Sequence, residues 1–242
     1  MKPNTYIYLL TSALILISHS SFAQDEDLDI VKNYISVDPI LPLFGTFQAN
    51  YERGIGANTS LGVSFGYKGS SGVFEVTQIS FDRFDSNDLN FSGFKIIPEF
   101  RWYFQKRKSG LNGLYLGAYF KYQDASADLG GVYRSRNDEV SEILIDANLK
   151  SSVFGIELGY KWQLKKGFFI DLIFAGPGFS TNRITLTEIS AVPQAFYDDL
   201  SEALQDIGII DFIDPDFRVN GNQETKITLP AWRYGIKLGY AF

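Results

Sequence analysis

The chain has no cysteine and a single histidine, His19, among its 242 residues. Without cysteine, disulfides do not hold this protein together. His19 lies in a segment that we expect to be removed on export. The mature chain then has no histidine for Ser-His-Asp or Cys-His catalysis, and none for the usual zinc and transition-metal sites. We therefore predict no catalytic residue, no metal site and no cofactor.

Long hydrophobic runs are also missing after Ala23. No later stretch reaches the roughly 18 uninterrupted apolar residues that indicate a transmembrane helix. If the protein lies in a membrane, it must therefore cross it with strands. A basic surface is lacking as well, because the formal net charge is -6. This charge argues against a nucleic-acid partner, which needs a basic face.

The first residues have the pattern of a secretory signal peptide. Lys2 provides a small positive region, residues 6–17 form a short apolar run, and Ser21-Phe22-Ala23 is a small-x-small cleavage site. We predict export, cleavage after Ala23 and a single mature domain over residues 24–242. An uncleaved N-terminal anchor is the alternative, which the short run and the good cleavage site disfavour.

Residues 232–242 alternate strictly between large apolar side chains and polar or small ones. Such alternation predicts a strand with one apolar face. In a water-soluble sandwich that face would pack on a core, whereas in an outer-membrane barrel it would contact lipid and the opposite face would line a polar lumen. The strand resembles the C-terminal signal by which the barrel assembly machinery recognises its substrates, through Tyr234, Ile236, Leu238, Tyr240 and Phe242.

Seven further segments carry the same alternation, with turn residues between them. Eight strands, with both chain ends on the periplasmic side, make the smallest usual outer-membrane barrel. We therefore predict an all-β fold, an eight-stranded antiparallel up-and-down transmembrane β-barrel. The predicted strands cover residues 30–38, 44–53, 60–67, 91–104, 114–122, 149–164, 168–179 and 232–242.

From the second strand on, the connections between these segments alternate in length, as expected of a barrel with short periplasmic turns and long extracellular loops. The first outer turn, over residues 39–43, is unusually short. The short turns are basic, which suits an anionic inner leaflet, and the long loops are mostly acidic. The predicted turns cover residues 54–59, 105–112 and 165–167, and the predicted long loops cover residues 68–89, 123–148 and 180–226.

The three tryptophans, Trp102, Trp162 and Trp232, are predicted to lie on the outward face near strand ends. Aromatic girdles occupy this position at the lipid interfaces of membrane barrels. Their placement favours a membrane barrel, and a soluble secreted barrel is the alternative.

Three segments carry a resemblance to a known family. They are Tyr51-Glu52-Arg53 with Ser60-Leu61-Gly62-Val63 after a short turn, Phe100-Arg101-Trp102-Tyr103-Phe104, and the terminal strand to Phe242. With them the chain resembles the small eight-stranded outer-membrane proteins of the OmpA/OmpX type, and more narrowly the uncharacterised barrels common in Bacteroidota. The resemblance implies an outer-membrane location and transfers no activity.

The inward phase of the predicted strands carries charged residues. One interpretation is a general acid and base pair, or a constriction that selects ions. The other is a plug of salt bridges, because an eight-stranded interior is only wide enough for side chains and buried charges must be paired. We favour the plug. The predicted lumen residues are Glu52, Lys95, Glu99, Arg101, Lys121, Glu157, Lys161, Asp171, Arg233 and Lys237.

One helical signal falls within the last long loop. Apolar residues recur at helical spacing between Pro193 and Gly208, which predicts an amphipathic helix over residues 193–207. Its apolar face could bind a partner or a ligand, or it could fold onto neighbouring loops or the barrel mouth as a lid, which we favour. The candidate partner surface consists of Phe196, Leu200, Leu204 and Ile207.

The sequence thus predicts a structural or interaction protein, and not an enzyme: a plugged outer-membrane barrel with long acidic loops. A narrow pore is the alternative, and a lipid-modifying enzyme that works from Glu or Asp is a weaker third. The expected partners are outer-membrane lipids, the barrel assembly machinery during biogenesis and an envelope protein. The pore interpretation rests on glycines that would leave room in the lumen: Gly62, Gly155, Gly159, Gly235 and Gly239.

Overall fold

The computed structural model describes residues 31–69, 80–81, 83–105, 110–206, 210, 213–214 and 216–242. The predicted signal peptide, its cleavage site and the predicted first strand residue Ile30 lie outside these residues, as does Ile207 of the predicted helix. The signal peptide and the domain boundary at residue 24 therefore stay predictions. The part from Val31 to Phe242 is one compact unit and is described below by itself.

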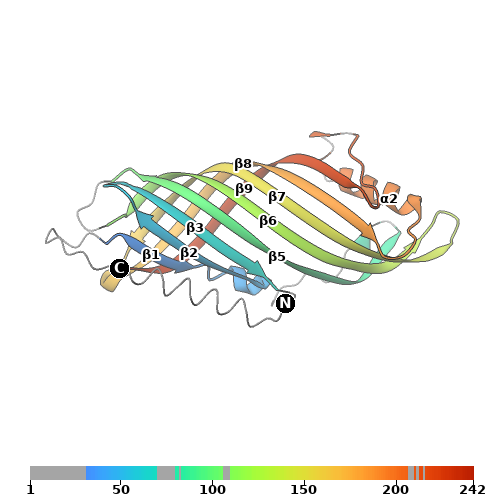
Figure 1. Cartoon of the computed structure of the whole chain (residues 1–242), viewed down its shortest axis with the longest axis horizontal. Coiled ribbons are helices and arrows are strands. Elements are labelled where there is room, and N and C mark those ends of the chain that lie inside the picture. The colour runs from blue at the N-terminus through green and yellow to red at the C-terminus, as the bar shows by residue number, and fades with distance from the viewer. Residues whose placement is uncertain are drawn as a thin grey trace. The chain divides into compact units, whose positions relative to one another are not determined.

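Nine strands and one α-helix are described in this unit, with two short 3-10 helices (Figure 1). No helix in the described part of the chain is both long and apolar enough to cross a membrane. In chain order the elements are β1 (Asn33–Val37), η1 (Leu41–Phe44), β2 (Thr46–Gly54), β3 (Thr59–Lys68), β4 (Ser80–Phe81), β5 (Phe84–Tyr103), β6 (Gly113–Arg134), β7 (Val140–Gln163), η2 (Lys165–Gly167), β8 (Phe168–Glu188), α2 (Gln194–Gln205) and β9 (Glu224–Ala241).

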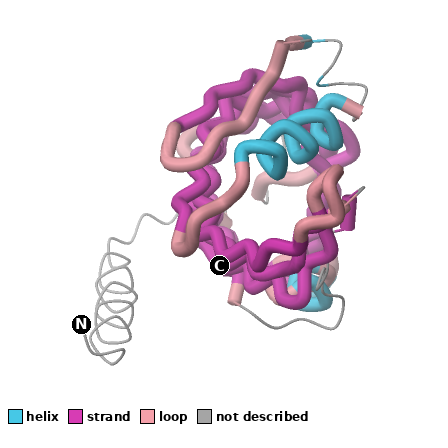
Figure 2. Tube along the Cα trace, turned by 90° about the vertical axis from the view of Figure 1, so that its right-hand side faces the viewer, coloured by secondary structure: helices cyan, strands magenta, loops and turns pink. Residues whose placement is uncertain are grey.

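Eight of the strands close into a ring (Figure 2). Each strand pairs antiparallel with its neighbour along the chain. β1 pairs with β9, and β3 pairs with β5 over the whole length of β3. β4 pairs only with β5 and lies outside the ring. The prediction of an all-β, eight-stranded antiparallel up-and-down barrel is confirmed, and so is the helix before the last strand.

The outer connections differ from the prediction. The predicted loop over residues 123–148 is in large part strand, because β6 runs on to Arg134 and β7 begins at Val140. The predicted loop over residues 180–226 is strand only at its two ends, since β8 runs to Glu188 and β9 begins at Glu224. β5 likewise begins at Phe84, within the predicted loop over residues 68–89. In Figure 1 these long strands continue toward α2 well beyond the ends of β1, β2 and β3.

The part of the barrel near the short turns is apolar on its outside. On β7 the outward residues Phe154, Ile156 and Leu158 are 66%, 52% and 39% exposed, and Trp162 and Leu164 continue the row. Equivalent exposed apolar residues on the other strands complete a band around the ring, here called the apolar belt. The row from Phe154 to Leu164 has the length of a tilted strand that crosses a bilayer, about 9–11 residues.

Beyond the belt the same strands exchange their apolar and polar faces. On β7, Ile143 and Ile145 are buried inside the ring, while Asp146 and Lys150 are exposed outside it. The alternation of side chains continues without a break, but the apolar set now faces inward, as in a water-soluble sheet. This reversal explains why the predicted strands ended too early: the outward apolar pattern stops where the belt stops.

Aromatic side chains gather at the belt edge near the short turns. The ring centroids of Trp102 and Phe104 lie 4.7 Å apart, and those of Tyr160 and Trp162 lie 4.4 Å apart. Trp232 does not lie near a strand end as predicted, because β9 begins at Glu224. Four residues of the predicted assembly signal are exposed on the outside of β9, and Ile236 is half-buried: Tyr234, Ile236, Leu238, Tyr240 and Phe242.

The helix α2 lies over part of one end of the ring, the end that faces the viewer in Figure 2. Pro193 precedes it with an extended backbone, which suits a helix start. The helix packs on the inward face of the strand extensions and on the chain that follows it. The buried residues of this cluster, here called the α2 core, are Phe84, Tyr133, Ile143, Ile145, Leu186, Phe196, Tyr197, Ile210, Phe217, Val219 and Ile227.

Candidate functional site

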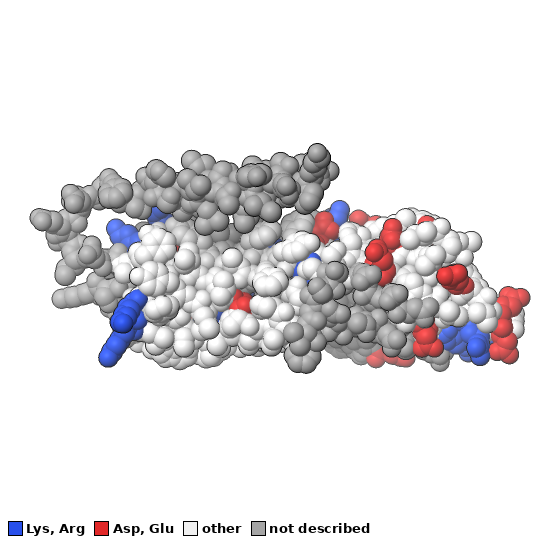
Figure 3. Space-filling model, turned by 90° about the horizontal axis from the view of Figure 1, so that it is seen from below, with Lys and Arg blue, Asp and Glu red and all other residues white. Residues whose placement is uncertain are grey.

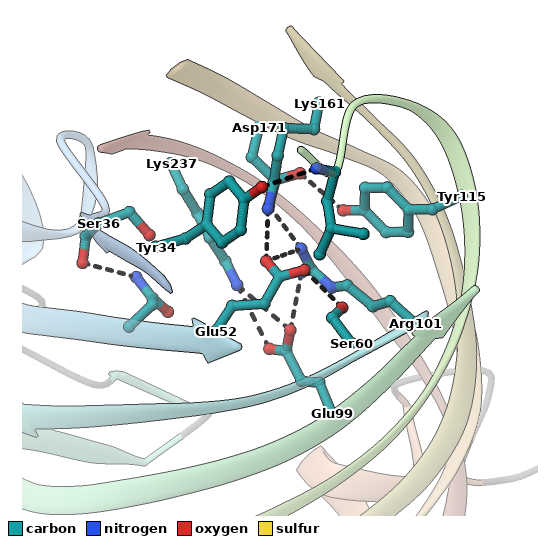
Figure 4. Close-up of polar contacts among 12 residues, drawn as sticks. Tyr34, Ser36, Glu52, Ser60, Glu99, Arg101, Tyr115, Lys161, Asp171 and Lys237 are labelled. Atoms are coloured by element: carbon teal, nitrogen blue, oxygen red, sulfur yellow. Dashed lines mark hydrogen bonds and ion pairs between the residues drawn. The ribbon is translucent and has the colours of Figure 1, made fainter. Parts of the chain in front are cut away.

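Arg101 on β5 is the centre of a charged cluster inside the belt (Figure 4). Its guanidinium contacts four carboxylates and its side chain is only 1% exposed. The N–O distances are 3.0 Å to Glu157, 2.6 Å to Asp171, 2.7 Å to Glu99 and 3.3 Å to Glu52. The planar, forked guanidinium has five N–H donors for surrounding carboxylates, whereas an ammonium group has three.

Three more cations complete the cluster from β7 and β9. Arg233 pairs with Glu157 at 2.7 Å and also with Glu99. Lys237 lies 3.3 Å from Glu99, and Lys161 pairs with Glu52. These cations and the four carboxylates around Arg101 are here called the lumen network. It balances four positive against four negative groups, so its formal charge is zero.

Hydroxyl groups fill the remaining acceptor positions of the carboxylates. Tyr103 and Ser60 donate to Glu52 at 2.7 and 2.6 Å, Tyr115 donates to Asp171 at 2.7 Å, and Ser64 donates to Glu99 at 3.1 Å. The predicted set missed these residues, although they share the inward phase of the charges. Their inward phase was the available signal, because a tyrosine hydroxyl on the charged face of a strand can donate to a carboxylate.

Aromatic rings also cover the cations of the network. The guanidinium of Arg101 lies 4.4 Å from the ring centre of Tyr115, and the ammonium of Lys161 lies 4.3 Å from that of Tyr34. Such contacts favour a desolvated cation. Together, ion pairs, hydroxyls and rings satisfy the buried charges, which is the condition for a stable ionic interior.

Two of the glycines that suggested a pore have a different role. The room beside Gly155 is occupied by Tyr119, whose ring carbons would lie 2.7 Å from an added Cβ, and the hydroxyl of Tyr115 occupies the room beside Gly159. These two glycines thus admit large inward side chains. Gly235 differs, because an added Cβ would meet only Asp38, at 3.7 Å.

Two predicted lumen residues, Lys95 and Lys121, do not join the network. They lie closer to α2 along β5 and β6, and both line a cavity of about 160 Å³ with Arg233 and Lys237. Of the ten predicted lumen residues, the structure therefore brings eight into one network and leaves two beside a cavity.

The family model described as "Protein of unknown function (DUF3575)" matches residues 12–185 of the chain. The chain belongs to this family. The match covers β1 to most of β8 and ends before α2 and β9. No curated protein matches the chain.

Among solved structures, this DUF3575 protein is similar to Acinetobacter baumannii CarO, whose crystal structure is known. The two share 12% sequence identity over 90% of this chain and 100% of the other, with a TM-score of 0.35. The similarity is too low to carry an argument about function.

The apolar face of α2 in this DUF3575 protein is turned inward. Phe196 is 0% exposed and packs edge-on against Phe84 and Tyr133, with ring centroids 5.2 and 5.6 Å apart. Leu200 and Leu204 are half-buried against the same cluster. The candidate partner surface on these residues was therefore wrong, because their apolar area is already covered by the barrel. The lid interpretation fits the packing.

A hydrogen bond and an ion pair connect α2 to the barrel wall. The hydroxyl of Tyr133 on β6 donates to Asp199 on α2 at 2.7 Å, and the guanidinium of Arg136 lies 3.4 Å from the same carboxylate. Burial, together with the hydrogen bond to Asp199, raises the pKa of Tyr133 to about 12. Burial and a hydrogen bond to Glu188 raise the pKa of Tyr197 as well.

We expect the ionisation of Tyr133 to weaken the attachment of α2. An unperturbed tyrosine titrates near 10. Because the pKa of Tyr133 is higher in the folded state, its contribution to stability is complete below about pH 10 and is lost as the pH rises from about 10 to about 12. In tyrosinate absorbance titrations, the difference between the wild type and Tyr133→Phe should be centred near pH 12. A difference centred near 10 would contradict this assignment.

Proposed function

We propose that this protein is an integral outer-membrane barrel that contacts lipid through its apolar belt. In water, the exposure of Phe154, Phe179 and Tyr234, at 66%, 70% and 79%, would be costly over so many strands. Pairing of the eight strands around the ring satisfies most of the backbone hydrogen bonds that a bilayer requires, although β9 has no β1 partner before Leu238. The exposed end of β9 is the part that we expect the barrel assembly machinery to bind.

The charge distribution supports an orientation with the short turns in the periplasm and α2 outside. Most carboxylates visible in Figure 3 lie toward the end that carries α2, where some basic residues also lie, whereas the opposite end shows mainly basic residues. Lys165 and Lys166 occupy the turn between β7 and β8. Basic turns suit an anionic inner leaflet, and the acidic end suits an exposed outer surface.

Within this location we propose a structural or interaction role with a closed lumen. The observation that carries the proposal is Arg101, which is 1% exposed while it contacts four carboxylates. A buried guanidinium that contacts carboxylates from four different strands supports a lumen filled by side chains at its level. Because the apolar face of α2 is buried, an envelope partner would bind the polar outer surface, where Asp198, Glu202 and Asp206 are exposed.

Planar bilayer recordings test the closed lumen. We expect the folded wild-type protein to give no steady conductance, because the lumen network fills the barrel. Folding is checked first by the heat-dependent mobility shift of a membrane barrel in gel electrophoresis. A reproducible open channel would overturn the proposal and would favour a narrow pore for ions or small solutes. In that case Lys121→Glu should change the ion selectivity.

A further inference from the structure

A cavity of about 160 Å³ lies on the α2 side of the lumen network, beside β9. Its lining combines apolar side chains from the strands with four cations and one carboxylate. The cations are Lys95, Lys121, Arg233 and Lys237, and the carboxylate is Asp38.

The cavity lies beside a free edge of β9 in the barrel wall. β1 is short and pairs with β9 only from Tyr34 to Val37, opposite Ala241 to Leu238. The cavity is lined by Arg233 and Lys237, which face inward on β9, and also by Trp232 and Tyr234, which are 63% and 79% exposed on its outside. A single cavity reaches both faces of a strand only around a free strand edge. It is here called the lateral cavity.

Two of the cations in the lateral cavity lack a partner. Arg233 and Lys237 belong to the lumen network, but neither Lys95 nor Lys121 forms an ion pair or hydrogen bond with the described residues. The one carboxylate, Asp38, already accepts the backbone N–H groups of Ile40 and Leu41 at 2.9 and 3.1 Å. Cations that face one cavity repel one another, and a bound anion would relieve this repulsion.

The surface outside the lateral cavity is apolar. Val37 is 55% exposed at the end of β1, Phe47 is 68% exposed on β2, and Trp232 and Tyr234 flank the cavity on β9. The cavity itself has apolar walls at Ile97, Val153 and Ile173. A ligand with a compact anionic group and an apolar tail matches both parts.

We propose that the lateral cavity binds the phosphate group of a lipid from the leaflet around the barrel. The phosphate would lie between Lys95, Lys121 and Arg233, and the acyl chains would lie against the exposed apolar residues outside. The lipid source rests on the proposed membrane location, whereas the anion site itself does not. Free phosphate shares the same chemistry, and the experiment separates the two.

Binding is measured by calorimetry on the folded protein in a neutral maltoside detergent, so the result does not depend on conductance or on the membrane location. The probes are dihexanoyl phosphatidic acid, dihexanoylglycerol, which lacks the phosphate, and inorganic phosphate. We expect phosphatidic acid to bind at least about tenfold more tightly than either of the others, because the site pairs charges and also covers an acyl chain.

Two variants and a matched control test the residues. Lys95→Gln combined with Lys121→Gln should weaken phosphatidic acid binding by about tenfold or more, since charge-assisted hydrogen bonds are lost. Neither lysine is ion-paired, so the fold should be unaffected. Gly235→Phe should abolish binding by filling the lateral cavity, where an added side chain has open room. Lys150→Gln combined with Lys226→Gln, both exposed on the outside of the strand extensions, should bind like the wild type.

Each result of the binding experiment supports or overturns a stated part of the proposal. Equal affinities for phosphatidic acid and inorganic phosphate, both lost in the lysine variant, would support the anion site and overturn its lipid source. Unchanged phosphatidic acid binding in the double lysine variant or in Gly235→Phe would overturn the site. Tighter binding of dihexanoylglycerol than of phosphatidic acid would overturn it as well.

Discussion

Replacement of Arg101 by methionine is expected to lower the free energy of unfolding by about 3–5 kcal/mol, the cost of removing one partner from a buried ion pair. The variant leaves four carboxylates together inside the barrel, and those of Glu157 and Asp171 are 0% and 1% exposed. Methionine replaces much of the arginine stem, so the change removes charge more than packing. Arg101→Lys should give an intermediate loss, because one ammonium cannot contact four carboxylates.

The measurement is urea unfolding of the protein in lipid vesicles, followed by tryptophan fluorescence. The matched control is Arg183→Met, because Arg183 pairs with Glu224 at 3.6 Å on the exposed surface, where both side chains are about half exposed. Such a pair contributes about 1 kcal/mol or less. If Arg101→Met does not fold, its folding yield against that of the control gives the same comparison. Equal stability of the two variants would show that the lumen network does not hold the barrel together.

The inner layer of the barrel was largely predictable from the sequence. Strict alternation fixes which residues face inward, so the phase of Glu99, Glu157 and Arg233 followed from pattern alone. Which cation pairs with which carboxylate did not follow, because the partners lie on strands far apart in the chain. The register that brings Arg101 opposite Gly117 and Ser60, for example, depends on turn geometry and strand stagger.

The strand extensions were missed for a physical reason. Around Tyr122 and Val153 the apolar residues change from the outward to the inward face, so a search for lipid-facing alternation ends there. The inward apolar residues Ile143 and Ile145 keep the same period and reveal the extension only if both faces are followed. The lateral cavity was equally hidden, because it depends on β1 being much shorter than β9. Strand length differences of this kind are set by tertiary contacts.

Replacement of Phe196 by alanine is expected to detach α2 while the barrel stays folded. Phe196 is fully buried and contacts Phe84, Tyr133 and Tyr197 through edge-on ring contacts. Removing a buried phenylalanine costs about 3–5 kcal/mol. The loss should remain local, because the lumen network and the apolar belt do not involve α2, and stability differs between regions of a protein.

Limited proteolysis between β8 and β9 measures this local opening. A cost of about 3 kcal/mol raises the open population by roughly a hundredfold, and the cleavage rate rises with it when opening is fast relative to cleavage. Asp198→Ala is the matched control, since Asp198 is exposed on the same helix turn. The urea midpoint of the barrel should stay unchanged in both variants. Cleavage of Phe196→Ala at the rate of the control would contradict the proposal that Phe196 holds α2 on the barrel as a lid. A fall in the urea midpoint of Phe196→Ala would show that the α2 core and the belt fold as one unit.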